Sequence, residues 1–202
     1  RSARAADTYD GVVFSPADPR QLYYAGNVLF RTTSGGKSWD VISPDLSRAK
    51  PEIPANVGVY RTKELESMKR RGVIYTVAPS PKDANVIWAG TDGGLIHVTK
   101  DGGKTWTDVT PPAVTAWSKV SLIDASRFDA GTAYAAINRF RLDDLAPLVL
   151  ATHDAGKTWT GLITPASIQA AYGLESTPSS LYATTVVRSR SNPSVIYASV
   201  WA

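Results

Sequence analysis

One short turn sequence occurs three times in this chain and constrains its fold more than any other feature. It reads VTKDGGKTW at residues 98–106, ATHDAGKTW at 151–159 and, less closely, RTTSGGKSW at 31–39. Internal similarity of this kind indicates that one supersecondary unit recurs along a chain. We therefore expect the fold to consist of copies of a single unit.

A second repeated element precedes each turn. It begins with serine, carries Asp or Asn three residues later and has an aromatic residue five positions beyond that. Short β-prone runs flank it, and a further short strand follows the tryptophan of each turn and ends at proline. Four short antiparallel strands per unit predict a blade of a β-propeller. The four copies are SPADPRQLYYAG from Ser15, SPKDANVIWAG from Ser80, SRFDAGTAYAA from Ser126 and SRSNPSVIYAS from Ser189.

The predicted fold class is therefore all-β, with about three blades and a partial fourth. The repeats place the blades at residues 11–44, 73–112, 120–165 and 184–202. Three variable segments, at 45–72, 138–149 and 165–181, are expected as insertions, and RTKELESMKRR and SIQAAYGL within them could each form a helical turn or two. Three blades and part of a fourth do not readily close a ring. We expect the chain to belong to a larger propeller or, alternatively, to assemble through its open blade edges.

The repeated turn has a local structural explanation. A carboxylate can accept hydrogen bonds from the backbone of its own turn, and glycine adopts backbone conformations that are costly for other residues. We expect Asp101 and Asp154 to shape their turns, and Trp39, Trp106 and Trp159 to fold back between neighbouring strands and anchor the hairpins. The predicted structural residues of the three turns are Ser34, Gly36, Trp39, Asp101, Gly103, Trp106, Asp154, Gly156 and Trp159.

The turn pattern Ser/Thr-x-Asp-x-Gly-x-Ser/Thr-Trp resembles the Asp-box, or bacterial neuraminidase (BNR) repeat, of sialidases, xyloglucanases and sortilin-type propellers. The second and third copies match the pattern fully, whereas the first has Ser34 in place of the aspartate. The wider sequence, over about residues 8–163, looks like large bacterial proteins with sortilin-like or "glycosyl hydrolase"-labelled propellers. This resemblance implies an extracytoplasmic propeller, which is secreted, periplasmic or at the cell surface. It does not settle an activity, because the fold serves unrelated functions.

Catalytic carboxylates were sought outside these turns. Glycoside hydrolysis requires two carboxylates about 5–10 Å apart. The candidates are Asp92, Asp124 and the adjacent pair Asp143 and Asp144. Asp92 and the pair also have structural explanations, because Asp92 precedes two glycines of a turn and the pair lies in a loop with two arginines. The arginine cluster and the Tyr/Glu nucleophile pair of a sialidase cannot be assigned.

Composition excludes several other chemistries. The chain has no cysteine and only two histidines, His97 and His153, so we expect neither a thiolate or histidine-rich metal site nor a cofactor. The formal charge of +4 comes largely from residues 60–72, which we interpret as a solvated insertion and not as a nucleic-acid surface. No apolar run approaches the length of about 20 residues that a membrane span needs, and no signal peptide is visible.

Two functions remain after these exclusions. The first is a non-catalytic propeller module that binds a protein, peptide or glycan, or contributes to a cell-surface assembly, because loops vary on a constant blade core. The alternative is a polysaccharide-acting glycoside hydrolase, similar to a xyloglucanase or sialidase, whose catalytic carboxylates lie partly outside this chain. The sequence leaves open the ligand, the number of blades and the oligomeric state.

Overall fold

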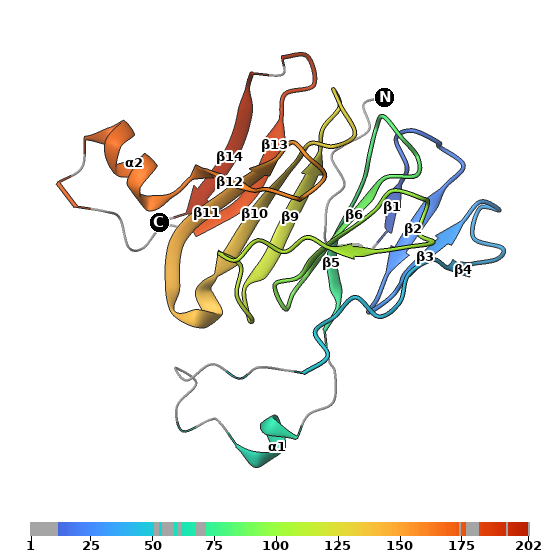
Figure 1. Ribbon diagram of the computed structural model, residues 1–202, viewed down its shortest axis with the longest axis horizontal. Helices are drawn as coiled ribbons and strands as arrows, with labels where there is room; N and C mark the ends of the chain where they lie inside the picture. The colour runs from blue at the N-terminus through green and yellow to red at the C-terminus, as the bar shows by residue number, and fades with distance from the viewer. Residues whose placement is uncertain are drawn as a thin grey trace.

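The computed structural model describes residues 12–50, 53, 59, 62–67, 72–173, 175–176, 182–192 and 194–201. Within these residues the chain forms three four-stranded antiparallel sheets and one two-stranded hairpin. They lie side by side in an open, curved row (Figure 1). We call these units blades 1 to 4 in chain order. The strands of each blade follow one another in sequence order, so each blade is a meander. The predicted all-β class with propeller blades is confirmed.

The strands are short, as the spacing of the turn signals indicates. Blade 1 contains β1 (Val12–Phe14), β2 (Leu22–Ala25), β3 (Leu29–Thr32) and β4 (Asp40–Val41). Blade 2 contains β5 (Ile74–Pro79), β6 (Ile87–Thr91), β7 (Ile96–Thr99) and β8 (Thr107–Asp108). Blade 3 contains β9 (Lys119–Ala125), β10 (Ala133–Arg139), β11 (Asp144–Thr152) and β12 (Thr160–Ile163). Blade 4 contains β13 (Tyr182–Arg188) and β14 (Ile196–Trp201).

The two insertions between blades contain short helices where the sequence predicts them. Helix α1 spans Lys63–Glu66 and helix α2 spans Pro165–Tyr172. In α2 the Thr164 hydroxyl accepts a hydrogen bond from the Ser167 amide, and the Ser167 hydroxyl accepts one from the Thr164 amide. This reciprocal cap fixes the start of the helix. Parts of the predicted insertions at 45–72 and 165–181, and the predicted blade ends at residues 11 and 202, lie outside the described residues.

The segment 138–149 differs from its expected form as an insertion with a loop. Strands β10 and β11 run through most of it, with a 3₁₀ turn at Phe140–Leu142 between them. Arg139 and Asp144 face each other across the hairpin, and their side chains form an ion pair at 3.0 Å. The hairpin of blade 3 is therefore extended, because this cross-strand pair continues the ladder up to the turn.

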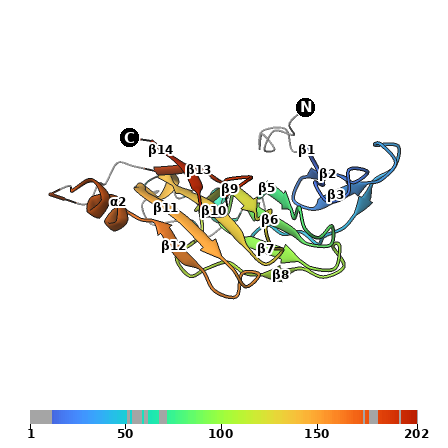
Figure 2. The ribbon, with the colours of Figure 1, turned by 90° about the horizontal axis from the view of Figure 1, so that it is seen from above.

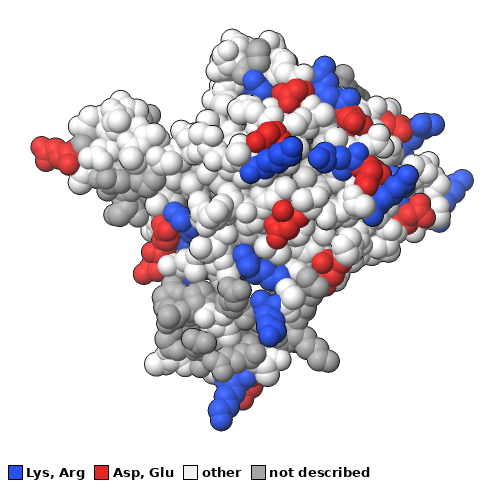
Figure 3. Space-filling model, in the orientation of Figure 1, with Lys and Arg blue, Asp and Glu red and all other residues white. Residues whose placement is uncertain are grey.

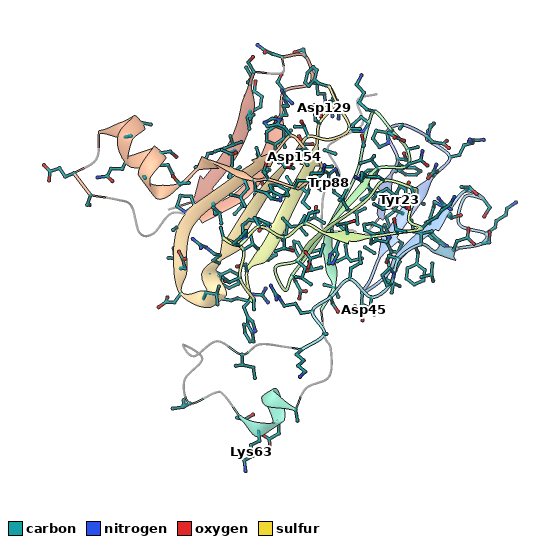
Figure 4. The ribbon with its side chains drawn as sticks, viewed as in Figure 1. Tyr23, Asp45, Lys63, Trp88, Asp129 and Asp154 are labelled. Atoms are coloured by element: carbon teal, nitrogen blue, oxygen red, sulfur yellow. The ribbon has the colours of Figure 1, made fainter. Side chains whose placement is uncertain are left out.

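The core lies at the joints between successive blades. Three clusters of buried apolar side chains occupy the joints of blades 1 and 2, blades 2 and 3, and blades 3 and 4. The repeated aromatic residue contributes a large buried side chain in each complete blade, as Tyr23, Trp88 and Tyr134 are at most 2% exposed (Figure 4). Its equivalent in blade 4, Tyr197, is 63% exposed. The face of blade 4 directed away from blade 3 is thus uncovered by the described residues.

The first strands of the four blades lie next to one another along one side of the molecule. Strand β9 contacts both β5 and β13, and β5 contacts β1. Figure 2 shows these first strands along one side of the molecule and the fourth strands β8 and β12 along the other. This is the arrangement of a propeller, in which the first strands border the central channel.

Candidate binding groove

A groove of about 850 Å³ runs along the first strands of the blades. Residues at equivalent repeat positions line it. Two residues before the repeated serine, the lining residues are Val13, Ala78, Asp124 and Val187; one residue after that serine they are Pro16, Pro81, Arg127 and Arg190. The groove is therefore a consequence of the repeat, and its polar residues stand where the other blades have apolar ones.

The buried hydroxyl of the repeated serine holds the turn that follows the first strand of each blade, beside the groove. Ser15, Ser80 and Ser126 are at most 2% exposed. The Ser15 hydroxyl accepts a hydrogen bond from the Asp18 amide at 3.1 Å, and the Ser126 hydroxyl accepts one from the Phe128 amide at 3.1 Å. Each serine thus fixes the backbone on which the next residue, proline or arginine, faces the groove.

Asp124 is the charged member of an otherwise apolar set of equivalent residues. Its carboxylate accepts a hydrogen bond from the Arg188 amide at 2.7 Å, which joins blade 3 to blade 4. Burial raises the pKa of Asp124, although the Arg188 amide and the nearby charges of Arg127, Arg188 and Arg190 oppose that rise. The carboxylate is therefore held in a partly dehydrated place at the wall of the groove.

Arginines surround this carboxylate. The Arg188 guanidinium lies over the ring of Phe128 at 4.8 Å and over that of Tyr134 at 5.4 Å, and it donates to the Ser126 hydroxyl at 3.2 Å. Arg127 and Arg190 are exposed at the same end of the groove. Three arginines, Arg127, Arg188 and Arg190, stand near two aspartates, Asp124 and Asp129, so this end of the groove carries an excess of positive charge.

Asp124 was a candidate from the sequence, whereas the arginines around it were not. The signal was available in the aligned repeats, where SPAD and SPKD in blades 1 and 2 become SRFD and SRSN in blades 3 and 4. A change from proline to arginine at one position of a regular repeat marks the two blades that carry the charge.

Asp92 does not line the groove. It follows β6 in a turn, and its carboxylate accepts a hydrogen bond from the Val73 amide at 2.9 Å. Arg141 donates to the backbone carbonyl of Asp92, and Arg48 donates to that of Gly93 at 2.6 Å. These contacts give Asp92 a structural role at the end of the blades opposite the serine turns.

Asp143 and Asp144 lie where the 3₁₀ turn of blade 3 meets β11. Asp143 ends the 3₁₀ turn in the left-handed conformation, with φ of 57°. Asp144 pairs with Arg139 and also accepts a hydrogen bond from the Ala146 amide at 2.9 Å. The catalytic candidates Asp92 and Asp144 are thus each bound within the fold. A catalytic role for Asp92, Asp143 and Asp144 remains a prediction.

The three repeated turns share one hydrogen-bond pattern. In the second, the Asp101 carboxylate accepts hydrogen bonds from the Thr105 hydroxyl at 2.6 Å and the Thr105 amide at 2.9 Å. In the third, Asp154 accepts the same two bonds from Thr158 at 2.7 and 2.9 Å. In the first, the hydroxyl of Ser34 accepts the equivalent amide bond at 3.0 Å.

These bonds also change the acidity of the turn carboxylates. Hydrogen bonds from the Thr158 hydroxyl and amide lower the pKa of Asp154 to about 2. The equivalent bonds from Thr105 hold the pKa of Asp101 well below its usual value. Both carboxylates are therefore ionised acceptors that stabilise their own turns. Figure 4 shows Asp154 near Asp129, at the end of the molecule away from Asp45 and Lys63.

The tryptophan rings were expected to fold back between neighbouring strands, and the structure shows which strands Trp106 and Trp159 meet. The Trp106 indole donates to the Ile42 carbonyl of blade 1 at 2.8 Å, and the Trp159 indole donates to the Val109 carbonyl of blade 2 at 2.8 Å. Each ring therefore reaches the preceding blade. Trp39 is 40% exposed and makes no hydrogen bond to the residues that the structure describes. Trp106 and Trp159 are partly buried against the apolar clusters at these joints, where each indole N–H finds a carbonyl acceptor.

Charges of both signs cover the visible face of the molecule. Figure 3 shows acidic and basic side chains interleaved over the blades on the right of the view. The described residues contain no group of three His, Cys, Asp or Glu side chains that could hold a metal ion. Among them, no helix is long and apolar enough to cross a membrane.

Comparison with solved structures identifies the fold. An ancestral GH74 enzyme superposes with a TM-score of 0.60 and 21% identity, over 93% of this chain and 21% of that protein. A protein of the COPII outer coat vertex gives 0.55 and 13%, over 93% of this chain and 43% of that protein. YCF48 from Cyanidioschyzon merolae gives 0.54 and 18%, over 89% of this chain and 46% of that protein.

These neighbours place the chain in the class of β-propellers. The chain spans less than half the length of each of them. At such low identities the likeness shows the fold alone, and the neighbours include both an enzyme and a coat protein. No protein-family model and no curated protein sequence matches the chain.

Proposed function

We propose that this chain is a non-catalytic binding module that holds an extended, mainly apolar peptide segment bearing a carboxylate. The observation that carries the proposal is the groove along the first strands. Its walls are apolar over blades 1 and 2, and Arg127 and Arg190 stand at the end formed by blades 3 and 4. Binding sites commonly combine such apolar walls with a few charged groups that fix the orientation of the ligand.

The lining favours a peptide over a glycan. The only aromatic residue among the described lining residues is Phe14, whereas aliphatic side chains and prolines make up most of the wall. Such walls suit aliphatic side chains, which are held by burial of apolar surface. Guanidinium groups bind carboxylates in a planar, two-pronged geometry, so the two arginines favour an acidic side chain or a free carboxyl terminus.

The localisation proposed with this function is extracytoplasmic. It rests on the resemblance of the repeated turns to the Asp-box of exported propeller proteins. Measurement of the cell fraction that contains the protein tests it independently of binding.

A defined pair of peptides tests the binding function. Each is a fluorescein-labelled peptide of alternating valine and serine, one ending in two aspartates and the other in two lysines. We expect the acidic peptide to bind and the basic peptide to bind at least about tenfold more weakly, as measured by fluorescence anisotropy. Arg190→Ala should weaken binding of the acidic peptide about fivefold or more.

Lys157→Ala is the matched control, because Lys157 is an exposed basic residue on the repeated turn of blade 3 and does not line the groove. This variant should bind the acidic peptide like the unaltered chain. Equal binding of the two peptides would contradict the proposal. Binding of a xyloglucan oligosaccharide without binding of either peptide would also contradict it.

Glycoside hydrolysis is the second candidate function, and Asp124 is the observation that favours it. Burial raises the pKa of this carboxyl, as the general acid of a glycosidase requires. Asp124 is the one carboxylate among the described lining residues, so its partner would have to come from outside them. Release of sugar from xyloglucan that is abolished by Asp124→Asn but retained by Asp92→Asn would support this function.

A further inference from the structure

The outer face of blade 1, which is directed away from blade 2, carries an unusual amount of exposed apolar surface. Half of the large apolar side chains that are exposed among the described residues belong to this blade. The strand register places Val12 beside Tyr24, and Tyr24 beside Phe30. We define the outer face by the residues Val12, Phe14, Tyr24, Phe30 and Trp39.

Equivalent residues of blades 2 and 3 are buried against the blade that precedes each of them. Tyr24 is 48% exposed, whereas its equivalents Ala89 and Ala135 are 0% exposed. Val12 is 41% exposed, whereas its equivalents Val77 and Ile123 are 8% and 4% exposed. The repeat therefore supplies two examples of what covers this face, and in both it is a neighbouring blade.

The glycine of the repeated turn gives a second, independent comparison. A Cβ atom on Gly103 would lie 2.5 Å from the Ile42 carbonyl oxygen, and one on Gly156 would lie 2.6 Å from the Val109 Cβ. Around Gly36 no atom of the described residues lies within 4 Å of the same position. Blades 2 and 3 thus pack their turn glycine closely against the preceding blade, while no described residue packs against the same glycine of blade 1.

The partner residue at both occupied joints has a fixed place in the repeat. Ile42 lies three residues after Trp39, and Val109 lies three residues after Trp106. Each supplies the carbonyl that accepts the indole hydrogen bond and the branched side chain that meets the glycine. A blade joint of this protein is therefore a defined contact between a turn and the end of a fourth strand.

We propose that the outer face of blade 1 is the docking surface for another blade of the same repeat, supplied by polypeptide outside residues 12–201. That blade ends its fourth strand with a branched apolar residue three positions after its turn tryptophan. The carbonyl of this residue accepts the Trp39 indole hydrogen, and its side chain contacts Gly36. Because Tyr24 replaces the alanine of blades 2 and 3, the docked blade has smaller side chains opposite it.

Among the described residues of a second copy, each residue three positions after a turn tryptophan already lies at an occupied joint. Ile42 and Val109 already accept Trp106 and Trp159. The third equivalent residue, Leu162, packs in the joint that β13 and β14 form with blade 3. The docking surface therefore fits a separate blade, and self-association is an outcome of the test that would overturn the proposal.

Site-specific photo-crosslinking tests this proposal. The photoreactive p-benzoyl-phenylalanine replaces Tyr24 in the protein expressed from its complete natural reading frame. The same group replaces Phe140 in the control. Phe140 is also an exposed aromatic residue, but it lies in the 3₁₀ turn of blade 3 and not on the outer face of blade 1. Both proteins are compared with the unaltered one by circular dichroism before illumination, and mass spectrometry identifies the cross-linked peptides.

We expect a cross-link from position 24 to a peptide that lies outside residues 12–201 and belongs to another copy of the repeat. Position 140 should give no such product. A cross-link from position 24 to a second copy of residues 12–201 would overturn the proposal. A product with a peptide that lacks the repeat, or no product from a correctly folded protein, would overturn it as well.

Discussion

The first repeated turn and the two later ones have nearly the same sequence but different surroundings. Trp106 and Trp159 each bond to the preceding blade, while Trp39 is 40% exposed. Trp39 instead packs edge-on against Tyr24 of its own blade, with ring centroids 6.3 Å apart. The internal hydrogen bonds of all three turns are alike. The polar residues therefore build each turn locally, whereas in the second and third turns the tryptophan, and the glycine two residues after the aspartate, act between blades.

Removal of the tryptophan side chain should give the largest difference in stability between the first turn and the later turns. We expect Trp106→Ala to lower the free energy of unfolding by about 3 kcal/mol, because it removes a large packed ring and leaves the Ile42 carbonyl without its donor. Trp39→Ala should lower it by about 1 kcal/mol or less, since this ring is largely exposed. Urea unfolding of the chain of residues 1–202 measures both. Equal losses would mean that the ring acts within its own hairpin.

Addition of a methyl group at the turn glycine should give the next largest difference in stability between the first and the second turn. Gly36 and Gly103 both have positive φ angles, of 89° and 98°, so alanine introduces a similar backbone strain at each. Gly103→Ala also forces an atom against the Ile42 carbonyl, and we expect it to cost about 1–3 kcal/mol more than Gly36→Ala. Thermal unfolding of the two variants provides the test.

The same pair of glycine variants also tests whether another blade docks on the first turn. In the protein from the complete reading frame, a docked blade would crowd position 36 as Ile42 crowds position 103. Gly36→Ala should then become as damaging as Gly103→Ala. A difference between the two variants that is unchanged from the shorter chain would contradict docking at this turn.

The turn carboxylates should give a smaller effect that depends on pH. Hydrogen bonds lower the pKa of Asp154 to about 2 in the folded chain, while an unfolded aspartate has a pKa of about 3.9. The stabilisation is therefore fully present above about pH 4 and is lost as the pH falls toward 2. We expect Asp154→Asn to flatten the decline in melting temperature over this range.

Ser34→Ala is the control for this experiment, because a serine does not titrate in the range. It should leave the slope of melting temperature against pH as it is in the unaltered chain, while Ser34→Asp should make the slope steeper. If Asp154→Asn leaves the acid-induced decline unchanged, the hydrogen bonds to this carboxylate do not contribute to stability.

The sequence predicts the blade architecture well because a blade is a local structure. Its strands, its serine turn and its Asp-containing turn are each encoded within a few residues, and their repetition makes the pattern plain. The joints were harder to predict, because the acceptor of the Trp106 indole lies 64 residues away in sequence. Sequence periodicity indicates that a tryptophan will pack, but it does not indicate on which blade.

The candidate groove was predicted in part for a similar reason. Asp124 was noticed as a carboxylate, but its environment depends on Arg188 and Arg190 of the next blade. Conversely, Asp92 looked accessible beside two glycines, yet its carboxylate binds the Val73 amide, where the chain returns from the insertion. A carboxylate in a loop is informative only when the backbone amides that could bind it are known.

The exchange of indole hydrogens with water reports directly whether each turn tryptophan is bonded across a blade joint. The chain contains six tryptophans, so nuclear magnetic resonance of ¹⁵N-tryptophan-labelled protein can follow each indole N–H, assigned by single Trp→Phe variants. In the chain of residues 1–202 the account predicts slow exchange for Trp106 and Trp159 and fast exchange for Trp39. Similar exchange rates for all three indoles would contradict the inference that Trp106 and Trp159 join blades while Trp39 makes no hydrogen bond to the described residues.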